Sequence, residues 1–134
     1  MDTKIAHLNM IQGVINRMAN NSFLLKGWSI TIVSALFALA TQEKGQQFLY
    51  LTILPCLMFW GLDGYFLWQE RMYRKLYQVV ADKDEKDIDF SMNATIYKKD
   101  INCWFCVVFS KTLLAFHGII LAIIILFILI LYFS

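Results

Sequence analysis

Three ionisable side chains lie within strongly apolar stretches of this sequence, where a charge can do chemistry or hold helices together. Lys26 lies in FLLKGWSITIVSALFALAT, Asp63 in WGLDGYFLW and His117 in TLLAFHGIILAII. A charge at the centre of a membrane helix costs at least about 2.5 kcal/mol, so such residues usually pair or serve a function. We therefore expect Lys26 and Asp63 to form an intramembrane ion pair or gate. His117 is a candidate polar group for a pore or for helix packing.

The cysteines are the other candidate reactive groups. The motif CWFC places Cys103 and Cys106 three residues apart, and Cys56 is the third cysteine. A zinc site needs two further ligands, and the remaining histidines and Cys56 are not spaced to supply them. A redox dithiol normally accompanies a thioredoxin-like βαβ pattern, which this sequence lacks. The sequence predicts no enzyme, no metal and no cofactor, and it leaves the role of the CWFC cysteines open.

Three apolar stretches are long enough to carry these residues into a bilayer. Hydrophobic residues make up 59% of the chain and charged residues 16%, whereas soluble domains are nearer half apolar and a quarter charged. A hydrocarbon core of about 30 Å needs roughly 20 helical residues, and residues 23–41, 48–68 and 112–133 meet this length. We predict an all-α integral membrane protein. It has an antiparallel transmembrane hairpin at 23–68, a third transmembrane helix and short cytoplasmic helices.

The hairpin predicts which residues lie opposite one another. The link at 42–47 has its midpoint between residues 44 and 45, and each helix rises by the same amount per residue. Lys26 and Asp63 are equally far from this midpoint, so they lie at the same depth. Two alternatives remain: Lys26 extends to the membrane surface, or Asp63 pairs with Arg71 or with a neighbouring subunit.

The distribution of positive charge predicts the orientation. Most lysines and arginines lie in the segment 69–111, two lie in the leader 1–22, and one lies in the link 42–47. The positive-inside rule places the leader and the 69–111 segment in the cytoplasm and the C-terminus outside. The net charge of +2 is too small to indicate a nucleic-acid partner.

Both cytoplasmic segments carry apolar stripes at helical spacing. The stripe of the leader consists of Leu8, Ile11, Ile15 and Met18. The stripe that continues the second span consists of Met72, Tyr73, Leu76 and Val80. We expect the leader to be an amphipathic helix that packs on the second stripe. The following loop, 82–92, is predicted to be a solvated linker, although alternating Ile88, Phe90 and Met92 suggest an extended piece that docks by one face. Residues 93–110 are predicted to form a helix that enters the membrane.

Small residues predict where helices come into close contact in lipid. The first span carries a narrow face formed by Gly27, Thr31, Ser34 and Ala38. Gly61 and Gly64 flank Asp63 on the second span. Such faces support packing within or between subunits, and we expect the protein to form a homo-oligomer in the bilayer.

Arg71, Arg74 and Lys75 form a basic cluster just beyond the second span. Two interpretations remain open. The cluster can anchor the protein by contacts with lipid phosphates. It can also bind an anionic nucleotide signal or an acidic partner protein, because guanidinium groups suit phosphate.

Two strings carry a resemblance to a known family: RMANNSFLLKGWSITIVSALFALA and FWGLDGYFLWQERMYRKLY. They resemble a family of small bacterial membrane proteins, which is similar to the two-transmembrane effectors of anti-phage defence and nucleotide-signalling systems. The resemblance covers about residues 11–80. Its characteristic positions here are Arg17, Asn21, Ser22, Lys26, Trp28, Trp60, Asp63, Tyr65, Glu70, Arg71, Arg74 and Tyr77.

The resemblance implies an oligomeric effector of the bacterial inner membrane, which permeabilises that membrane when a partner or small signal reports infection. Arg17 and Glu70 then join Arg71, Arg74 and Lys75 as candidate contacts for the signal. We expect no separate ligand-binding domain beside these helices, so the helices themselves or another protein would read the signal.

Two other classes of function remain open. A non-pore membrane anchor or adaptor would use residues 1–22 and 69–110 to recruit a cytoplasmic partner protein. A small transporter subunit would need a substrate path, to which Lys26, Asp63 and His117 could contribute polar groups. Ion flux distinguishes a pore from an adaptor.

Overall fold

The computed structural model describes residues 2–42, 46–101 and 103–133, and within these ranges the elements are helices joined by turns, without any strand. The elements in chain order are α1 (Asp2–Ala40), α2 (Gln46–Leu51), α3 (Ile53–Asp82), η1 (Glu85–Asp87), η2 (Ala94–Asp100), α4 (Trp104–Val108) and α5 (Lys111–Phe133). The predicted all-α class is confirmed.

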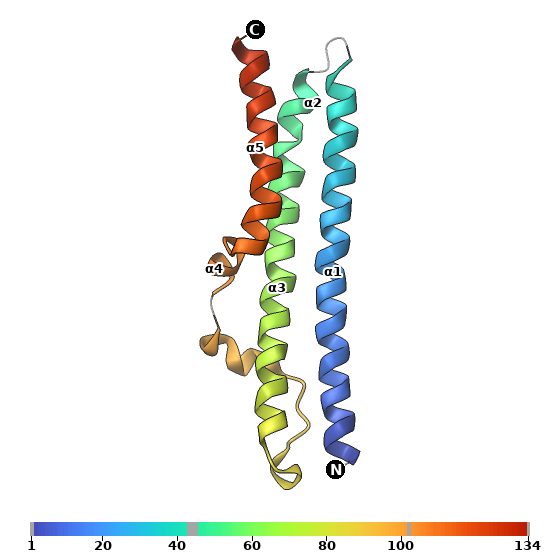
Figure 1. Cartoon of the computed structure of the whole chain (residues 1–134), viewed down its shortest axis with the longest axis vertical. Helices are drawn as coiled ribbons and strands as arrows, with labels where there is room; N and C mark the ends of the chain where they lie inside the picture. Colours follow the sequence, from blue (N-terminus) through green and yellow to red (C-terminus); the bar gives the residue numbers. More distant parts are fainter. Residues whose placement is uncertain (1, 43–45, 102, 134) are drawn as a thin grey trace.

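Three helical stretches are long and apolar enough to cross a membrane: Asp2–Ala40, Gln47–Asp82 and Lys111–Phe133. In Figure 1, α1 and α3 lie side by side along nearly their whole length and run in opposite directions. Helix α5 lies beside the first half of α3, and the segment with η2 and α4 follows the outside of α3. The N-terminus lies at one end of the bundle and the C-terminus at the other.

The one proline in the chain explains the only break in the second apolar stretch. Pro55 has no backbone N–H, so the carbonyl of Leu51 loses its α-helical partner. Helix α2 ends at Leu51 and α3 begins at Ile53, with the Thr52 hydroxyl donating a hydrogen bond of 2.5 Å to the Leu49 carbonyl. Helix α1 contains no proline, so the leader and the first apolar stretch form one continuous helix rather than two separate elements.

The two predicted stripes pack together at the N-terminal end of the bundle. The buried residues of this N-terminal cluster are Ile11, Ile15, Met72, Leu76, Val80, Ile88 and Ala94. Leu8 and Tyr73 pack against them. The prediction that the leader packs on the continuation of the second span is therefore confirmed.

The linker that follows α3 is docked on the bundle, so the prediction of a solvated linker is wrong at two residues. Ile88 is 8% exposed and Met92 packs on the N-terminal cluster. Phe90, between them, has φ 58° and is 47% exposed. A positive φ is uncommon for a bulky residue, and here it breaks the alternation that the sequence suggested.

The predicted helix over 93–110 is also wrong. Three successive side-chain turns lie at its start. The Ser91 N–H donates to the Asp89 carboxylate, the Asn93 N–H to the Ser91 hydroxyl, and the Thr95 N–H to the Asn93 side-chain oxygen, each at 3.1 Å. The Asn93 side chain is the N-cap of η2, so these turns fix where this short element begins. Further along, Ile101 is extended (φ −125°, ψ 165°), so η2 and α4 are separate short elements.

Candidate functional site

Four polar side chains from the three long helices meet inside the bundle, and we call them the polar cluster: Ser22, Lys26, Asp63 and His117. Asp63 of α3 is fully buried. Its Oδ2 lies 2.6 Å from Lys26 Nζ of α1 and 2.7 Å from His117 Nε2 of α5. Its Oδ1 accepts a hydrogen bond from the Ser22 hydroxyl of α1. One carboxylate thus joins all three long helices.

Helical spacing places the two α1 members on one face. Ser22 and Lys26 are four residues apart, which puts them one turn from each other, and Lys26 Nζ donates a hydrogen bond of 2.9 Å to Ser22 Oγ. Because the Ser22 hydroxyl uses its own hydrogen on Asp63, it can accept this bond at the same time. The ammonium and the hydroxyl therefore hold the carboxylate together.

Aromatic rings enclose the cluster. The Trp60 ring stacks on His117 with centroids 6.1 Å apart and an interplanar angle of 12°. Lys26 Nζ lies 5.8 Å from the centroid of the Phe116 ring, which is a cation–π distance. His117 Nε2 must carry a hydrogen to bond a carboxylate, and its buried Nδ1 has no hydrogen-bond partner among the described residues.

Helix α4 packs against α3 beside Asp63. The Trp104 indole donates a hydrogen bond of 3.2 Å to the Gly61 carbonyl, and the Trp60 indole donates one of 2.7 Å to the Val108 carbonyl. A Cβ added at Gly64 would lie 2.5 Å from Val108 Cγ2 and 3.4 Å from Val108 Cα. The small residues around Asp63 do mark a close contact, but the partner is α4, which the sequence did not predict.

The geometry of the polar cluster suits a contact that joins helices better than a site that binds a solute or an ion. Asp63 and His117 have no exposed surface, so a solute or ion cannot reach them in this arrangement. Hydrogen bonds to a charged group are roughly twice as strong as neutral ones, and they are strengthened further where water is excluded. In this state the polar cluster is a closed contact between helices.

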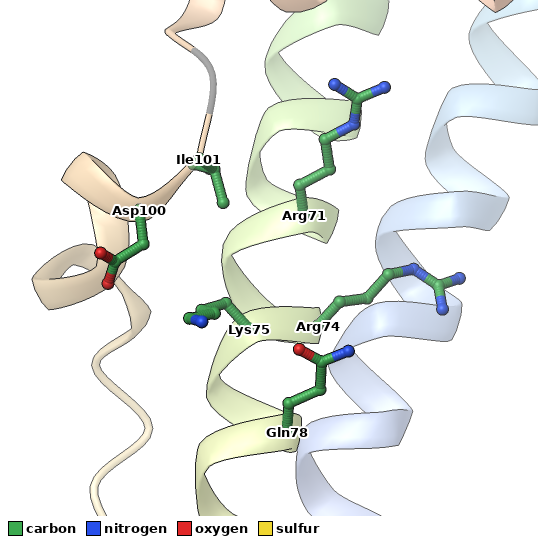
Figure 2. Close-up of a pocket in the computed structure, with 6 residues that line it drawn as sticks. All are labelled: Arg71, Arg74, Lys75, Gln78, Asp100 and Ile101. Atoms are coloured by element: carbon green, nitrogen blue, oxygen red, sulfur yellow. The ribbon is translucent and has the colours of Figure 1, made fainter.

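The predicted signal contacts are only partly brought together. Arg71, Arg74 and Lys75 line one cavity of about 350 Å³ on α3, shown in Figure 2. Glu70 pairs with Arg74 at 2.9 Å along the helix. Arg17 is exposed on α1 and does not line this cavity.

Sequence reasoning did not place two members of the polar cluster, Ser22 and His117, beside Asp63. Ser22 could have been found from its spacing of one turn before Lys26. His117 was recognised as an ionisable residue in an apolar helix, but its contact with Asp63 depends on where α5 lies, and no spacing rule gives that position.

The side chains of the CWFC cysteines, Cys103 and Cys106, lie close together. Cys103 and Cys106 are exposed, with their sulfur atoms 3.0 Å apart, while Cys56 is buried. A hydrogen bond from the Cys106 thiol lowers the pKa of Cys103 below its usual range. Within the described ranges, no three histidine, cysteine or acidic side chains are grouped so that they could hold a metal ion.

Comparisons with protein-family models, with curated proteins and with solved structures found no match to this chain.

Proposed function

We propose that this protein is a multi-pass effector of the bacterial inner membrane that forms homo-oligomers and permeabilises the membrane when it is triggered. The N-terminus and the part of the 69–111 segment up to Ile101 lie in the cytoplasm, and the C-terminus lies outside. Helix α4 lies at the level of Gly61 and Gly64, within the second span. The observation that carries the proposal is the polar cluster, in which one buried carboxylate joins three helices of membrane-spanning length. Ionisable residues in a membrane are expensive and usually functional.

In this proposal the polar cluster is a latch that keeps the resting protein closed. While Asp63 holds Lys26 and His117, α1 and α5 cannot separate from α3 without leaving a charge unpaired in an apolar environment. A signal at the cytoplasmic end weakens these contacts and lets the helices rearrange with those of neighbouring subunits. The resemblance to defence effectors supports infection as the trigger and a partner protein or nucleotide as the signal.

The test is the membrane potential of bacteria that express the chain, followed with a voltage-sensitive dye and with propidium entry. Asp63→Asn removes the charge that holds the latch, so we expect depolarisation without any trigger, whereas the wild type stays polarised. Lys86→Gln is the control, because Lys86 is exposed and lies outside both the polar cluster and the candidate signal contacts.

A second variant covers the case in which Asp63→Asn fails to fold. Lys26→Met combined with Asp63→Asn removes both charges, so no unpaired charge remains, and this variant also lacks the latch. Both variants are compared with the wild type at equal amounts in the membrane fraction. A normal potential in both would refute the latch, and a wild type that never depolarises during phage challenge would refute the effector.

A membrane anchor or adaptor is the second candidate, and the N-terminal cluster favours it. Ile11, Ile15, Met72 and Leu76 form a packed core outside the segments predicted to span the membrane. Such a core can present a fixed surface to a cytoplasmic partner. An adaptor would retain that partner after detergent extraction and would cause no ion flux in any of the variants above.

A further inference from the structure

Two neighbouring cavities lie between α3 and the segment that contains η2 and α4, and Ile101 lines both. The first, of about 350 Å³, is lined by Arg71, Arg74, Lys75, Gln78, Asp100 and Ile101. The second, of about 480 Å³, is lined by Trp68, Lys98, Lys99, Ile101, Cys103, Trp104 and Phe105. One cavity is therefore rich in cations and the other in aromatic rings.

Two of the three cationic side chains that line the first cavity are available to a ligand. Among the described residues Arg71 and Lys75 form no ion pair, while Arg74 is paired with Glu70. Figure 2 shows Lys75 on the side of Asp100, and Arg71 and Arg74 on the side of α1. The three side chains diverge from α3 instead of converging on one point. Arg71 and Lys75 are one turn apart on this helix, so both long side chains must turn towards each other to bind one phosphate between them.

The second cavity combines apolar surface with a free donor. The indole nitrogen of Trp68 is buried and has no hydrogen-bond partner in the parts of the chain that the structure describes. Lys98 Nζ lies 5.3 Å from the centroid of the same ring. Tryptophan and lysine side chains of this kind are typical of the boundary between the hydrocarbon core and the lipid headgroups.

The order of these residues along α3 matches the order of groups in a phospholipid. Trp68, which borders the apolar stretch, comes first, and Arg71 and Lys75 follow one and two turns later. A lipid with its acyl chains beside Trp68 and Trp104 would have its phosphate at the level of Arg71 and Lys75. Gln78 and Asp100, at the far side, can bond headgroup hydroxyls.

We propose that these two cavities together form a binding site for an anionic glycerophospholipid with a hydroxylated headgroup. Arg71 and Lys75 bind the phosphate, and Trp68, Trp104 and Phe105 contact the first acyl carbons. The proposal rests on membrane insertion as proposed above, but it does not depend on pore formation or on the latch.

The test is lipid retention by the purified full-length chain in detergent, measured by native mass spectrometry during titration with phosphatidylglycerol. Each basic residue near a membrane surface contributes roughly fivefold to the binding of anionic lipid, so Arg71→Gln with Lys75→Gln should weaken binding about thirtyfold. Each single variant should give about a fivefold loss. The matched control is Lys83→Gln with Lys86→Gln, which removes the same charge from the linker and should leave binding unchanged.

Two further ligands identify the source of the phosphate. Soluble glycerol phosphate has the headgroup chemistry without acyl chains, and diacylglycerol has the chains without phosphate. Weak binding of both, with tight binding of phosphatidylglycerol, supports the lipid site. Equal affinity for glycerol phosphate and phosphatidylglycerol would overturn it in favour of a soluble phosphate ligand. Wild-type affinity in all the Arg71 and Lys75 variants would also overturn it, whatever the membrane potential experiment shows.

Discussion

At the scale of single residues, Asp63 determines how the interior is held together. Its two oxygens receive hydrogen bonds from a lysine, a histidine and a serine, and its side chain is completely buried. A buried ion pair adds little over well-packed apolar residues of the same size, but removing one partner is strongly destabilising. The charges at positions 26 and 63 therefore matter more as a pair than separately.

The pair predicts a large coupling energy. Asp63→Asn should lower the free energy of unfolding by about 3 to 5 kcal/mol, because Lys26 then lacks a counter-charge in an apolar environment. Lys26→Met in the same background should recover much of this loss. Unfolding in mixed detergent micelles, followed by circular dichroism for both single variants and the double variant, gives the coupling as a double-mutant cycle.

Two results would argue against this account of Asp63. Losses that simply add in the double variant would mean that the two charges do not interact. An Asp63→Asn protein as stable as the wild type would mean that the carboxylate is neutral in the folded state.

The same residues show how far sequence reasoning reaches at this scale. Lys26 and Asp63 could be placed together because the rise of a helix is constant and the link between the two stretches is short. His117 could not be placed, since its neighbour depends on the path of residues 83–110. That path is set by side-chain turns and by the contacts of α4, none of which has a periodic signature.

At the scale of elements, the close approach of α4 to α3 depends on one glycine. Gly64 faces Val108 with no room for a Cβ, whereas a Cβ at Gly27 of α1 meets nothing within 4 Å. Alanine is otherwise favoured over glycine inside a helix by about 1 kcal/mol. Substitution by alanine is therefore expected to change the free energy of unfolding in opposite directions at these two positions.

We predict that Gly64→Ala lowers the free energy of unfolding by about 1 to 3 kcal/mol, because Val108 and the backbone of α4 must move. Gly27→Ala should leave it unchanged or raise it by up to about 1 kcal/mol. Thermal unfolding in detergent compares the two variants.

Adding Val108→Ala to the Gly64→Ala protein removes the methyl group nearest to the new Cβ and should restore part of the loss. A Gly64→Ala protein that is more stable than the wild type would show that α4 is not held against α3 at this point.

The elements were predicted best where the pattern was long and periodic. The stripes of α1 and α3 repeat at helical spacing over several turns, so their packing was recognised correctly. Residues 93–110 also carry apolar residues at helical spacing, but the backbone is extended at Ile101 and Cys103, and the Cys103 side chain caps α4 as a separate helix.

At the scale of the whole molecule, one face of α1 is left uncovered. The small residues Gly27, Thr31, Ser34 and Ala38 are all exposed in the single chain. Of the two predicted alternatives, packing within the chain is not found at this face, and packing between subunits remains a prediction. Small-residue faces of this kind allow close helix contact in lipid.

Self-association through this face predicts that Gly27→Leu reduces the oligomer without unfolding the chain, since nothing within 4 Å obstructs a larger side chain there. Gly13→Leu is the matched control, because Gly13 lies on the same helix and is equally unobstructed. Light scattering of each purified variant in detergent measures the mass of its oligomer. An equal loss of oligomer in both variants would exclude this face as the contact, and so would an unchanged oligomer in both.

Helix α1 extends over 39 residues from Asp2 to Ala40 without a break. It is therefore about 58 Å long, nearly twice the thickness of a hydrocarbon core of about 30 Å. Because α1 has no break at which a motion could be absorbed, a rotation imposed on its N-terminal end would be transmitted along the whole helix. Lys26 lies within this helix, and a rotation of the helix about its axis would move the ammonium group away from Asp63. In the arrangement proposed above, a partner that binds only the first few turns of α1 would therefore act on the ion pair near the cytoplasmic end of the span.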